Sequence, residues 1–326
     1  MTHILVTGGA GFIGAHTCKA LALMGYQPVV LDNLSTGYRD FVHWGPLVQA
    51  DIADTMAVAA TITQYGITAM MHFAGSIVVP DSVRDPLTYY DNNISKSVRL
   101  IQTAVDHGVQ HIVFSSSAAV YGMPDVARIP VHTPLNPISP YGYTKAVIER
   151  LLSDLSAARP DVRTLSLRYF NAAGSDPDGQ VGESHVPETH LIPLALDALS
   201  KKRAALTVFG RDYPTPDGTC IRDYIHVSDL AMAHVQGLRY LAKGGASQIL
   251  NLGIGQGFSI LEVLRTIETV CQMPVPFVWG LRREGDPARL VADADASRRI
   301  LDWTPVHTSL DNIVADAWAW RRASKG

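Results

Sequence analysis

HILVTGGAGFIGAHT, residues 3–17, decides the fold class, because an apolar run leads directly into closely spaced glycines and then into a helical pattern. The glycines satisfy G-x-G-x-x-G at Gly9, Gly11 and Gly14, and G-x-x-G-x-x-G starting at Gly8. Glycines permit a tight turn and let the backbone approach a pyrophosphate at the free N–H groups of a helix start. A glycine triplet alone is weak evidence, but its place between strand and helix predicts a dinucleotide-binding turn.

A carboxylate supports this interpretation and indicates which dinucleotide binds. The run PVVLD, residues 28–32, is predicted to be the second strand, and it ends in Asp32, which lies 18 residues after Gly14. This spacing is close to that of the acidic residue that holds the ribose 2′-OH of NAD. Because the same carboxylate would repel a 2′-phosphate, the sequence favours NAD over NADP.

Apolar runs alternate with helical periodicity along the first half of the chain. AMMHFAG, HIVFSSS and TLSLRYF read as strands, separated by helix-length segments. This pattern predicts an α/β fold, a Rossmann-type doubly wound parallel sheet, with a smaller C-terminal substrate-binding domain. From Ala172 onward, polar and turn-forming residues increase. We therefore expect an NAD-binding domain over residues 1–171, rejoined by 225–255, and a smaller second domain over 172–224 and 256–326.

Composition excludes several classes of protein. A net charge of −3 over 326 residues gives no basic signature, so nucleic acid is not an expected partner. We see no signal peptide and no run of 18 apolar residues, so a cytoplasmic protein without a membrane partner is expected. Cys18, Cys220 and Cys271 lack CxxC spacing, which favours reduced thiols and no metal site.

SPYGYTKAVIER, residues 139–150, places two tyrosines beside a lysine. If a helix begins near Pro140, Tyr141 lies one turn before Lys145 on the same face, whereas Tyr143 points elsewhere. A free tyrosine has a pKa of about 10, and a nearby ammonium together with the positive nicotinamide ring would favour the phenolate. A Y-x-x-x-K pair also occurs by chance on exposed helices. Its place downstream of a nucleotide-binding turn predicts a proton-transfer pair.

A second polar stretch, FSSSAAVYG at residues 114–122, is predicted to end a strand with three serines. Ligands of α/β sheets bind at the carboxyl ends of strands. Ser117 could therefore hydrogen-bond the substrate hydroxyl that Tyr141 deprotonates, although serines at a strand end are otherwise turn formers.

Together these stretches resemble the extended short-chain dehydrogenase/reductase family, and specifically its UDP-sugar 4-epimerase branch. The likeness runs essentially end to end, and DYPTPDGTCIRDYIHV, residues 212–227, is its most specific part. It implies a catalytic group of Ser117, Tyr141 and Lys145. Besides Tyr141 and Lys145, the residues expected to contact NAD are Gly8, Gly11, Phe12, Ile13, Gly14, Asp32, Asn33, Asp51, Ile52, Phe73, Ala74, Gly75, Asn92, Ser115 and Phe170.

The resemblance also implies a substrate, UDP-galactose or UDP-glucose, interconverted through transient oxidation at C4 with bound NAD. Arg222 and Arg283 suit a diphosphate because guanidinium groups form bidentate bonds with it, although salt bridges with acidic neighbours such as Asp223 are an alternative. The expected substrate contacts are Ser117, Asn171, His190, Leu191, Phe209, Arg222, Tyr224, Arg283, Asp286 and Leu290.

The chain departs from the family pattern at three positions. Ile77 stands where some members carry a lysine that contacts the cofactor. PETHLIP replaces PNNLMP, so that His190 stands where an asparagine touches the substrate. Leu290 occupies a position where a small residue admits N-acetylated sugars and a bulky residue excludes them. Acceptance of UDP-N-acetyl sugars therefore stays open.

Other functions remain as alternatives. A dehydratase would need acidic residues after the strand-end serines, where the chain has Ala118 and Ala119. Asp32 argues against a reductase that uses NADPH. A non-catalytic NAD-binding sensor would not need the three catalytic residues, and other UDP-sugars, including UDP-N-acetylglucosamine, pentose and uronate forms, are alternative substrates. The resemblance also implies a homodimer through helices at about residues 92–107 and 142–158.

Overall fold

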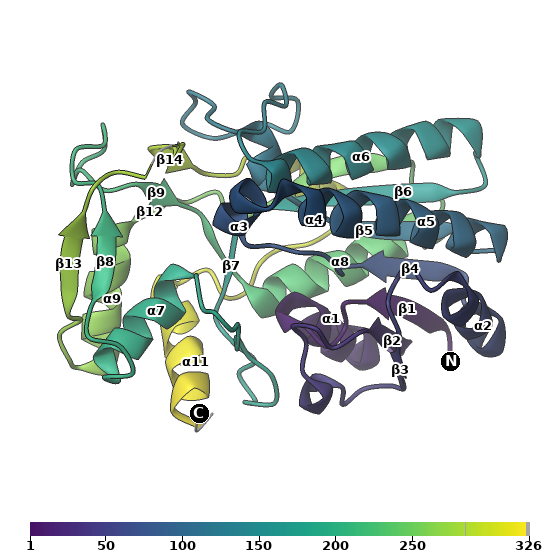
Figure 1. The fold of residues 1–326 in the computed structure, drawn as a ribbon, viewed down its shortest axis with the longest axis horizontal. Coiled ribbons are helices and arrows are strands. Elements are labelled where there is room, and N and C mark those ends of the chain that lie inside the picture. Colours follow the sequence, from purple (N-terminus) through teal and green to yellow (C-terminus); the bar gives the residue numbers. More distant parts are fainter. Residues whose placement is uncertain (284, 324–326) are drawn as a thin grey trace.

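The computed structural model describes residues 1–283 and 285–323, and a parallel sheet forms its centre (Figure 1). Seven strands run in the order β11-β6-β5-β4-β1-β2-β3, and every neighbouring pair is parallel. Their bounds are β1 His3–Thr7, β2 Gln27–Asp32, β3 Leu47–Gln49, β4 Ala69–His72, β5 His111–Ser117, β6 Arg163–Tyr169 and β11 Gln248–Leu252. The order reverses between β1 and β4, where sheets of this kind bind their ligands.

Helices cover both faces of this sheet because its strands are apolar on both sides. In β1, Ile4 and Val6 belong to one buried cluster and Leu5 to another, as the alternation of side chains along a strand requires. The first cluster includes α1 Phe12–Leu23, α8 Val227–Ala242 and α10 Asp295–Leu301. The second includes α2 Thr55–Tyr65, α5 Lys96–Asp106 and α6 Pro140–Ala158. The predicted doubly wound fold class is thereby confirmed.

A separate hydrophobic core lies on the left of Figure 1, away from the main sheet. It is formed by α7 Leu191–Leu199, α9 Ile260–Cys271 and α11 Leu310–Ala323, with the parallel pair β8 Leu206–Phe209 and β13 Phe277–Gly280. Short strands lie between this core and the sheet: β7 Asn171–Ala173, β9 Ile221–Arg222, β10 Tyr224–His226, β12 Phe258–Ser259 and β14 Arg289–Leu290. The remaining elements are η1 Arg39–Phe41, α3 Val79–Arg84, α4 Pro86–Tyr90, the π-helical turn η2 Asp91–Ser95 and η3 Ala118–Tyr121.

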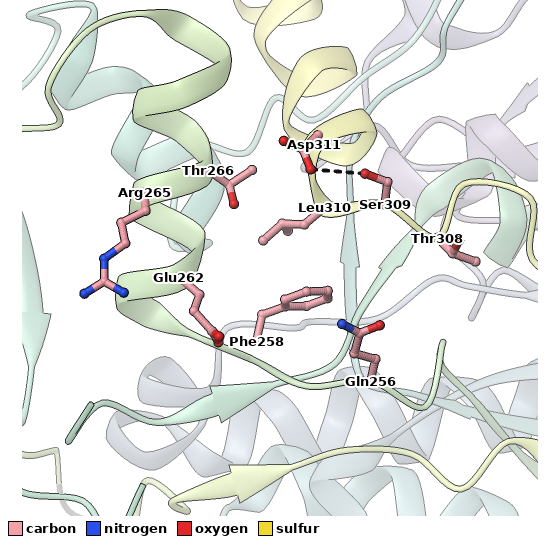
Figure 2. A pocket seen from close by; sticks show the side chains of 9 residues that line it. All are labelled: Gln256, Phe258, Glu262, Arg265, Thr266, Thr308, Ser309, Leu310 and Asp311. Carbon is pink, nitrogen blue, oxygen red and sulfur yellow. Dashed lines mark hydrogen bonds between the residues drawn. The ribbon is translucent and has the colours of Figure 1, made fainter. Parts of the chain in front are cut away.

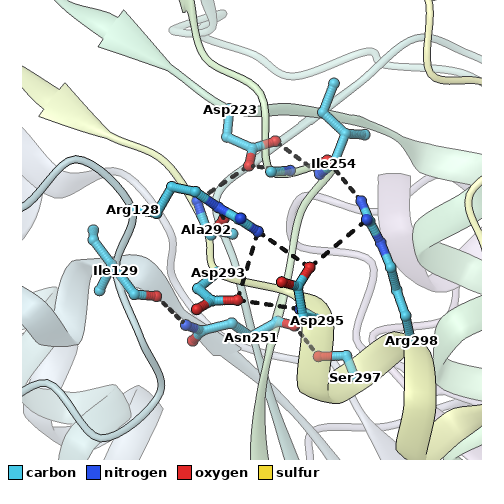
Figure 3. Close-up of polar contacts among 11 residues, drawn as sticks. Arg128, Ile129, Asp223, Asn251, Ile254, Ala292, Asp293, Asp295, Ser297 and Arg298 are labelled. Atoms are coloured by element: carbon cyan, nitrogen blue, oxygen red, sulfur yellow. Dashed lines mark hydrogen bonds and ion pairs between the residues drawn. The ribbon is translucent and has the colours of Figure 1, made fainter.

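One buried carboxylate joins the short strands to the main sheet. Asp223 lies between β9 and β10 and accepts backbone hydrogen bonds from Ile254 (2.9 Å) and Gly255 (3.0 Å), which follow β11. It accepts a third from Ala292 (3.1 Å), just beyond β14 (Figure 3). Because Asp223 is fully buried and hydrogen-bonded on both oxygens, it fixes the position of its neighbours Arg222 and Tyr224.

Two further findings concern the cysteines and the helices. The three cysteines are free and buried. Within residues 1–283 and 285–323, no helix combines the length and the apolar composition that crossing a membrane requires.

A buried ion pair holds α6 against the sheet. The guanidinium of Arg168 on β6 donates to both oxygens of Glu149 on α6, at 2.8 and 2.6 Å, and both side chains are buried. Arg168 also donates to the hydroxyl of Tyr121 (2.8 Å), and Ser116 on β5 donates to Glu149 (2.5 Å). The pair is therefore fully hydrogen-bonded, the condition under which a buried charge is tolerated.

We expect Arg168→Met to lower the free energy of unfolding by about 3–5 kcal/mol, because it leaves the Glu149 carboxylate buried without its partner. Urea denaturation would measure the change. Arg150 pairs with Asp154 on the exposed side of the same helix, so Arg150→Met is the matched control and should change stability by less than about 0.5 kcal/mol. Equal effects of the two substitutions would contradict this account.

Candidate functional site

The predicted nucleotide turn joins β1 to α1 and leaves no room for side chains. A Cβ on Gly14 would lie 2.1 Å from the carbonyl oxygen of Gly8, and a Cβ on Gly8 would lie 2.6 Å from the nitrogen of Ala74. Gly11 precedes α1 without any side-chain cap, so the first N–H groups of the helix remain free for an anion. The turn thus fits a pyrophosphate, and Phe12 and Ile13 begin the helix beside it.

Asp32 ends β2 next to this turn. Its carboxylate accepts hydrogen bonds from the backbone of Ala10 (3.0 Å) and Leu34 (2.8 Å). Across the sheet, the backbone of Phe73 and Ala74, directly after β4, donates to the carbonyl of Thr7 at 3.0 and 3.1 Å. The predicted cofactor residues at the ends of β1, β2 and β4 therefore flank the point where the strand order reverses.

A second group of predicted cofactor residues is linked by polar contacts. Asp51 follows β3 and accepts hydrogen bonds from Asn33 (3.1 Å) and from Lys96 (2.9 Å). Lys96 did not enter the sequence-based prediction, because nothing in its neighbourhood distinguishes it from a surface lysine. Ile52 is buried in the hydrophobic core, so its side chain supports the loop. Asn92, in the π-helical turn, donates to Ser76 at 3.0 Å.

The predicted catalytic residues lie together where β5 ends and α6 begins. As predicted, α6 starts at Pro140, and the hydroxyl of Ser139 caps it by accepting from Gly142 (3.2 Å). The partly buried side chain of Tyr141 interacts with that of Ser117, whereas Tyr143 is half exposed on another side of the helix. Burial raises the pKa of Tyr141, and the hydrogen bond with Ser117 opposes that rise. The expectation that neighbouring groups lower this pKa is therefore not met by the protein side chains alone, because burial outweighs them.

Lys145 is buried beneath this pair. Its ammonium donates to the carbonyl of Ser115 (2.9 Å) and lies 5.8 Å from the centre of the Tyr141 ring. Burial lowers the pKa of Lys145 to about 8, although the nearby charge of Glu149 raises it. The amine is thus held next to the tyrosine. Its pKa lies close to neutral pH, where the amine can gain or lose a proton.

Most of the predicted substrate residues are brought together by backbone pairing. Asn171 of β7 pairs with Tyr224 of β10, and Arg222 of β9 pairs with Leu290 of β14. The ring of Tyr224 is buried in the separate hydrophobic core that α7, α9 and α11 form, and Leu191 packs against the same core. Among the residues that this pairing brings together, Arg222 is the one whose side chain carries a charge for a ligand.

The two predicted diphosphate-binding arginines share one carboxylate. Arg222 makes a short hydrogen-bonded ion pair with Asp286, and the Nε of Arg283 lies 3.7 Å from the other oxygen of Asp286. The guanidinium of Arg283 also lies 4.5 Å from the centre of the Phe209 ring. The alternative of salt bridges with acidic neighbours is met by Asp286 and not by Asp223, because the Asp223 carboxylate is bound by backbone N–H groups. Glu284, a second such neighbour in the sequence, lies outside the described residues.

Three predicted residues have surroundings that the sequence does not indicate. Phe170 and Leu290 pack against the same small apolar cluster, which includes Tyr121. His190 directs Nδ1 at Glu183, and although burial by itself lowers the pKa of His190, the charge of Glu183 outweighs burial and raises it. The contact with Glu183 therefore fixes the orientation of the His190 imidazole.

A cavity of 480 Å³ lies elsewhere, between the start of α9 and the segment that leads into α11 (Figure 2). Ser309 donates to Asp311 across its rim at 3.2 Å. Its lining contains none of the predicted site residues: Gln256, Phe258, Glu262, Arg265, Thr266, Thr308, Ser309, Leu310 and Asp311. This cavity therefore contributes nothing to the site at the strand ends.

Comparison with known proteins gives one consistent result. The NAD dependent epimerase/dehydratase family matches residues 4–253. A UDP-glucose 4-epimerase of Rhizobium meliloti (strain 1021) is 48% identical over 318 residues, covering 98% of this chain and 96% of that protein. The structure of UDP-glucose 4-epimerase from Brucella ovis in complex with NAD has a TM-score of 0.95 at 45% identity, covering 98% of each chain. The epimerase from Bifidobacterium longum in complex with NAD+ and UDP has a TM-score of 0.94 at 35% identity, covering 99% of each chain.

We expect Gly14→Ala to abolish cofactor retention, because its Cβ would force the turn apart from the Gly8 carbonyl. NAD released by denaturing the purified protein should fall by about tenfold or more, which corresponds to about 1.4 kcal/mol or more of binding free energy. The control is Gly25→Ala, at a glycine of positive φ with nothing within 4 Å of a Cβ. This substitution should lower the free energy of unfolding by about 1–2 kcal/mol and leave the NAD content unchanged. Full NAD content in Gly14→Ala would disprove the assignment of the turn.

Proposed function

Because the chain belongs to the NAD dependent epimerase/dehydratase family, we propose that it is a UDP-glucose 4-epimerase that interconverts UDP-galactose and UDP-glucose with bound NAD. One observation carries the proposal: the partly buried Tyr141 lies beside Ser117 and is backed by Lys145 where β5 ends and α6 begins, and β5 is the neighbour of β4, at which the strand order reverses. A dehydratase would need acidic residues where the chain has Ala118 and Ala119, and a non-catalytic sensor would not need the three catalytic residues.

The proposed roles of the three side chains follow from their positions. The Tyr141 phenolate takes the proton of the sugar 4-OH, and the Ser117 hydroxyl hydrogen-bonds the same oxygen. The Lys145 ammonium, fixed by the Ser115 carbonyl, stabilises the phenolate electrostatically. Bound NAD would accept a hydride from C4 and return it to the opposite face after the 4-keto sugar has turned over.

Such a reaction requires tight binding of UDP and weak binding of the hexose, which must turn over. Arg222 and Arg283 supply bidentate, charge-assisted hydrogen bonds suited to the diphosphate. The Asp286 carboxylate contacts both guanidinium groups and would hold them in position for the diphosphate. Leu290 packs against the small apolar cluster that includes Tyr121 and would offer no hydrogen bond to the sugar hydroxyls.

The remaining predicted NAD and substrate contacts are part of this proposal. We assign NAD binding to residues 1–171 with 225–255, and UDP-sugar binding to 172–224 and 256–326, of which 284 and 324–326 lie outside the described residues. A cytoplasmic location is supported by the three free, buried thiols.

A homodimer is also part of the proposal, and α5 and α6 would form its interface. A hollow of 210 Å³ runs between these helices, lined by Val98, Ile101, Gln102, Val105, Asp106, Leu151, Leu155 and Arg159. Val98 is 37% exposed, and the hollow is mostly apolar in residue type. Two such helices from each of two subunits would bury this apolar stripe in a four-helix bundle.

Purified protein, with no NAD added, should convert UDP-galactose to UDP-glucose, and Tyr141→Phe should lower kcat by about 10²–10⁴-fold because general-base catalysis is lost. Tyr143→Phe, on the same helix but half exposed, is the matched control and should leave kcat unchanged. In Ser117→Ala, the rising limb of kcat/KM should move to higher pH, because the hydrogen bond that lowers the pKa of Tyr141 is removed.

Absence of product from the wild type, even with NAD supplied, would refute the hexose assignment and turn attention to pentose or uronate UDP-sugars. The same assay with UDP-N-acetylgalactosamine measures what the Leu290 side chain admits.

Val98→Asp should convert the dimer to monomer in sedimentation velocity, because two carboxylates would be buried in the bundle. Val306→Asp, at a side chain 79% exposed and outside these helices, should leave the sedimentation coefficient unchanged. A monomeric wild type at micromolar concentration would reject the dimer.

A further inference from the structure

A histidine–glutamate cluster lies in the loop that precedes α7, outside the proposed catalytic group. The loop reads ESHVPETH over residues 183–190, so the pattern Glu-x-His occurs twice within eight residues. One atom each of Glu183, His185, Glu188 and His190 lies within 4.8 Å of the corresponding atom of every other residue. We propose that these four side chains form a binding site for a divalent transition-metal ion, with zinc the best fit. This proposal goes beyond the epimerase function and does not depend on it.

The spacing of the four side chains suits one small ion. The Nδ1 of His185 lies 3.2 Å from Oε1 of Glu183 and 4.0 Å from Oε1 of Glu188. The Nδ1 of His190 lies 3.5 Å from the same Glu188 oxygen and closer still to Oε1 of Glu183. Ligand atoms about 2.0–2.2 Å from a tetrahedral ion lie about 3.3–3.6 Å apart, so small adjustments of the side chains would complete the site.

Four buried polar atoms in this cluster have no hydrogen-bond partner of acceptable geometry. They are Oε1 of Glu183, Nδ1 of His185, Oε2 of Glu188 and Nδ1 of His190. The Glu183 side chain is only 5% exposed and that of Glu188 only 7%. Three of these atoms, Oε1 of Glu183 and Nδ1 of both histidines, lie together beside the Glu188 carboxylate, whose Oε1 faces both histidines. Because unpaired buried carboxylate oxygens and imidazole nitrogens are costly, this cluster indicates a missing cation.

Nearby charges do not provide that cation. Arg321 on α11 acts electrostatically on both glutamates, but its guanidinium donates to both oxygens of Asp197, at 2.8 and 2.5 Å. The competing interpretation is that both histidines are protonated and form ion pairs with the glutamates. That interpretation agrees with the close contact between His190 and Glu183, whose charge raises the pKa of His190. The geometry favours an ion instead, because neither Nδ1 is aligned for a hydrogen bond with the carboxylate oxygen that it faces.

A second histidine cluster shows what a satisfied arrangement looks like. In the group His226, His307 and Asp316, Nδ1 of His226 accepts the backbone N–H of Ser228 at 3.1 Å. Its Nε2 faces Asp316 at 3.2 Å, so both nitrogens of this buried ring have partners. His226 therefore acts as a helix cap and gives no reason to expect a metal.

The ligand set indicates which ion the loop would bind. Imidazole nitrogens favour zinc and its neighbours over magnesium or calcium, and carboxylate oxygens complete many zinc sites. Backbone N–H groups of Thr189 and His190 donate to Oε1 of Glu188 at 2.8 and 2.9 Å, which orients that carboxylate. Four protein ligands from one short loop would close the coordination sphere, as in structural rather than catalytic zinc sites.

An ion here would fix the loop between the nucleotide turn and the substrate side. The ring of His185 packs edge-on against Phe12, with centroids 6.1 Å apart. The hydroxyl of Tyr38 donates to the carbonyl of Ser184 at 2.6 Å. On the other side, His190 directly precedes α7. The proposed metal would therefore fix the position of Leu191 and α7 relative to the glycine turn.

The test measures bound metal by mass spectrometry in full-length protein that has been incubated with zinc and then dialysed against metal-free buffer. We expect about one zinc per chain in the wild type, and Co²⁺ in its place should give the intense visible absorption of a tetrahedral site. His185→Gln should weaken binding by about tenfold or more, since loss of an outer partner alone costs about 10–100-fold. His132→Gln, at an exposed histidine elsewhere, is the matched control.

Zinc well below one equivalent in the wild type would overturn the proposal, as would equal binding by His185→Gln, and the ion-pair interpretation would replace it. The wild-type measurement needs no variant to fold. Circular dichroism and NAD content of His185→Gln would show whether its lost zinc reflects the site alone. Because metal content is measured without any sugar substrate, its failure is separate from failure of the epimerase assay.

Discussion

The site depends on one steric constraint, the contact between the backbone at the end of β1 and the start of α1. A Cβ on Gly14 would overlap the Gly8 carbonyl oxygen at 2.1 Å, and one on Gly8 would strike the chain that follows β4. Only glycine lets these three segments meet. Their meeting brings the free N–H groups of α1, the carboxylate of Asp32 and the loop after β4 to one point. The cofactor-binding edge follows from this contact.

The fold, and the proximity of Ser117, Tyr141 and Lys145, could be predicted from sequence because each rests on a local pattern. The alternation of buried strands and helices determines a parallel sheet, and the spacing of Tyr141 and Lys145 places both on one face of α6. Ser117 was predictable for a similar reason, because strand ends converge at one edge of such a sheet. In each case the residues that matter are neighbours along the chain or lie at equivalent ends of strands.

The parts that sequence reasoning missed are contacts between distant segments. Nothing in the neighbourhood of Glu149 or Arg168 indicates that they pair across α6 and β6, and the shared role of Asp286 between two arginines is equally invisible. The cluster in residues 183–190 is different, because its repeated Glu-x-His pattern was readable. The pKa of Tyr141 was missed because burial depends on the complete fold.

The bonds of Asp223 have a consequence for how the protein is made. A ribosome that has released residues up to about 255 has supplied every strand of the main sheet, which can then begin to form. Asp223 still lacks Ala292, Arg222 lacks its pairing with β14, and α7 lacks its neighbour α11. The half of the protein that carries the arginines therefore reaches its final order only near the end of synthesis. During translation, the nascent chain therefore holds every strand of the main sheet before the part to which we assign the sugar is complete.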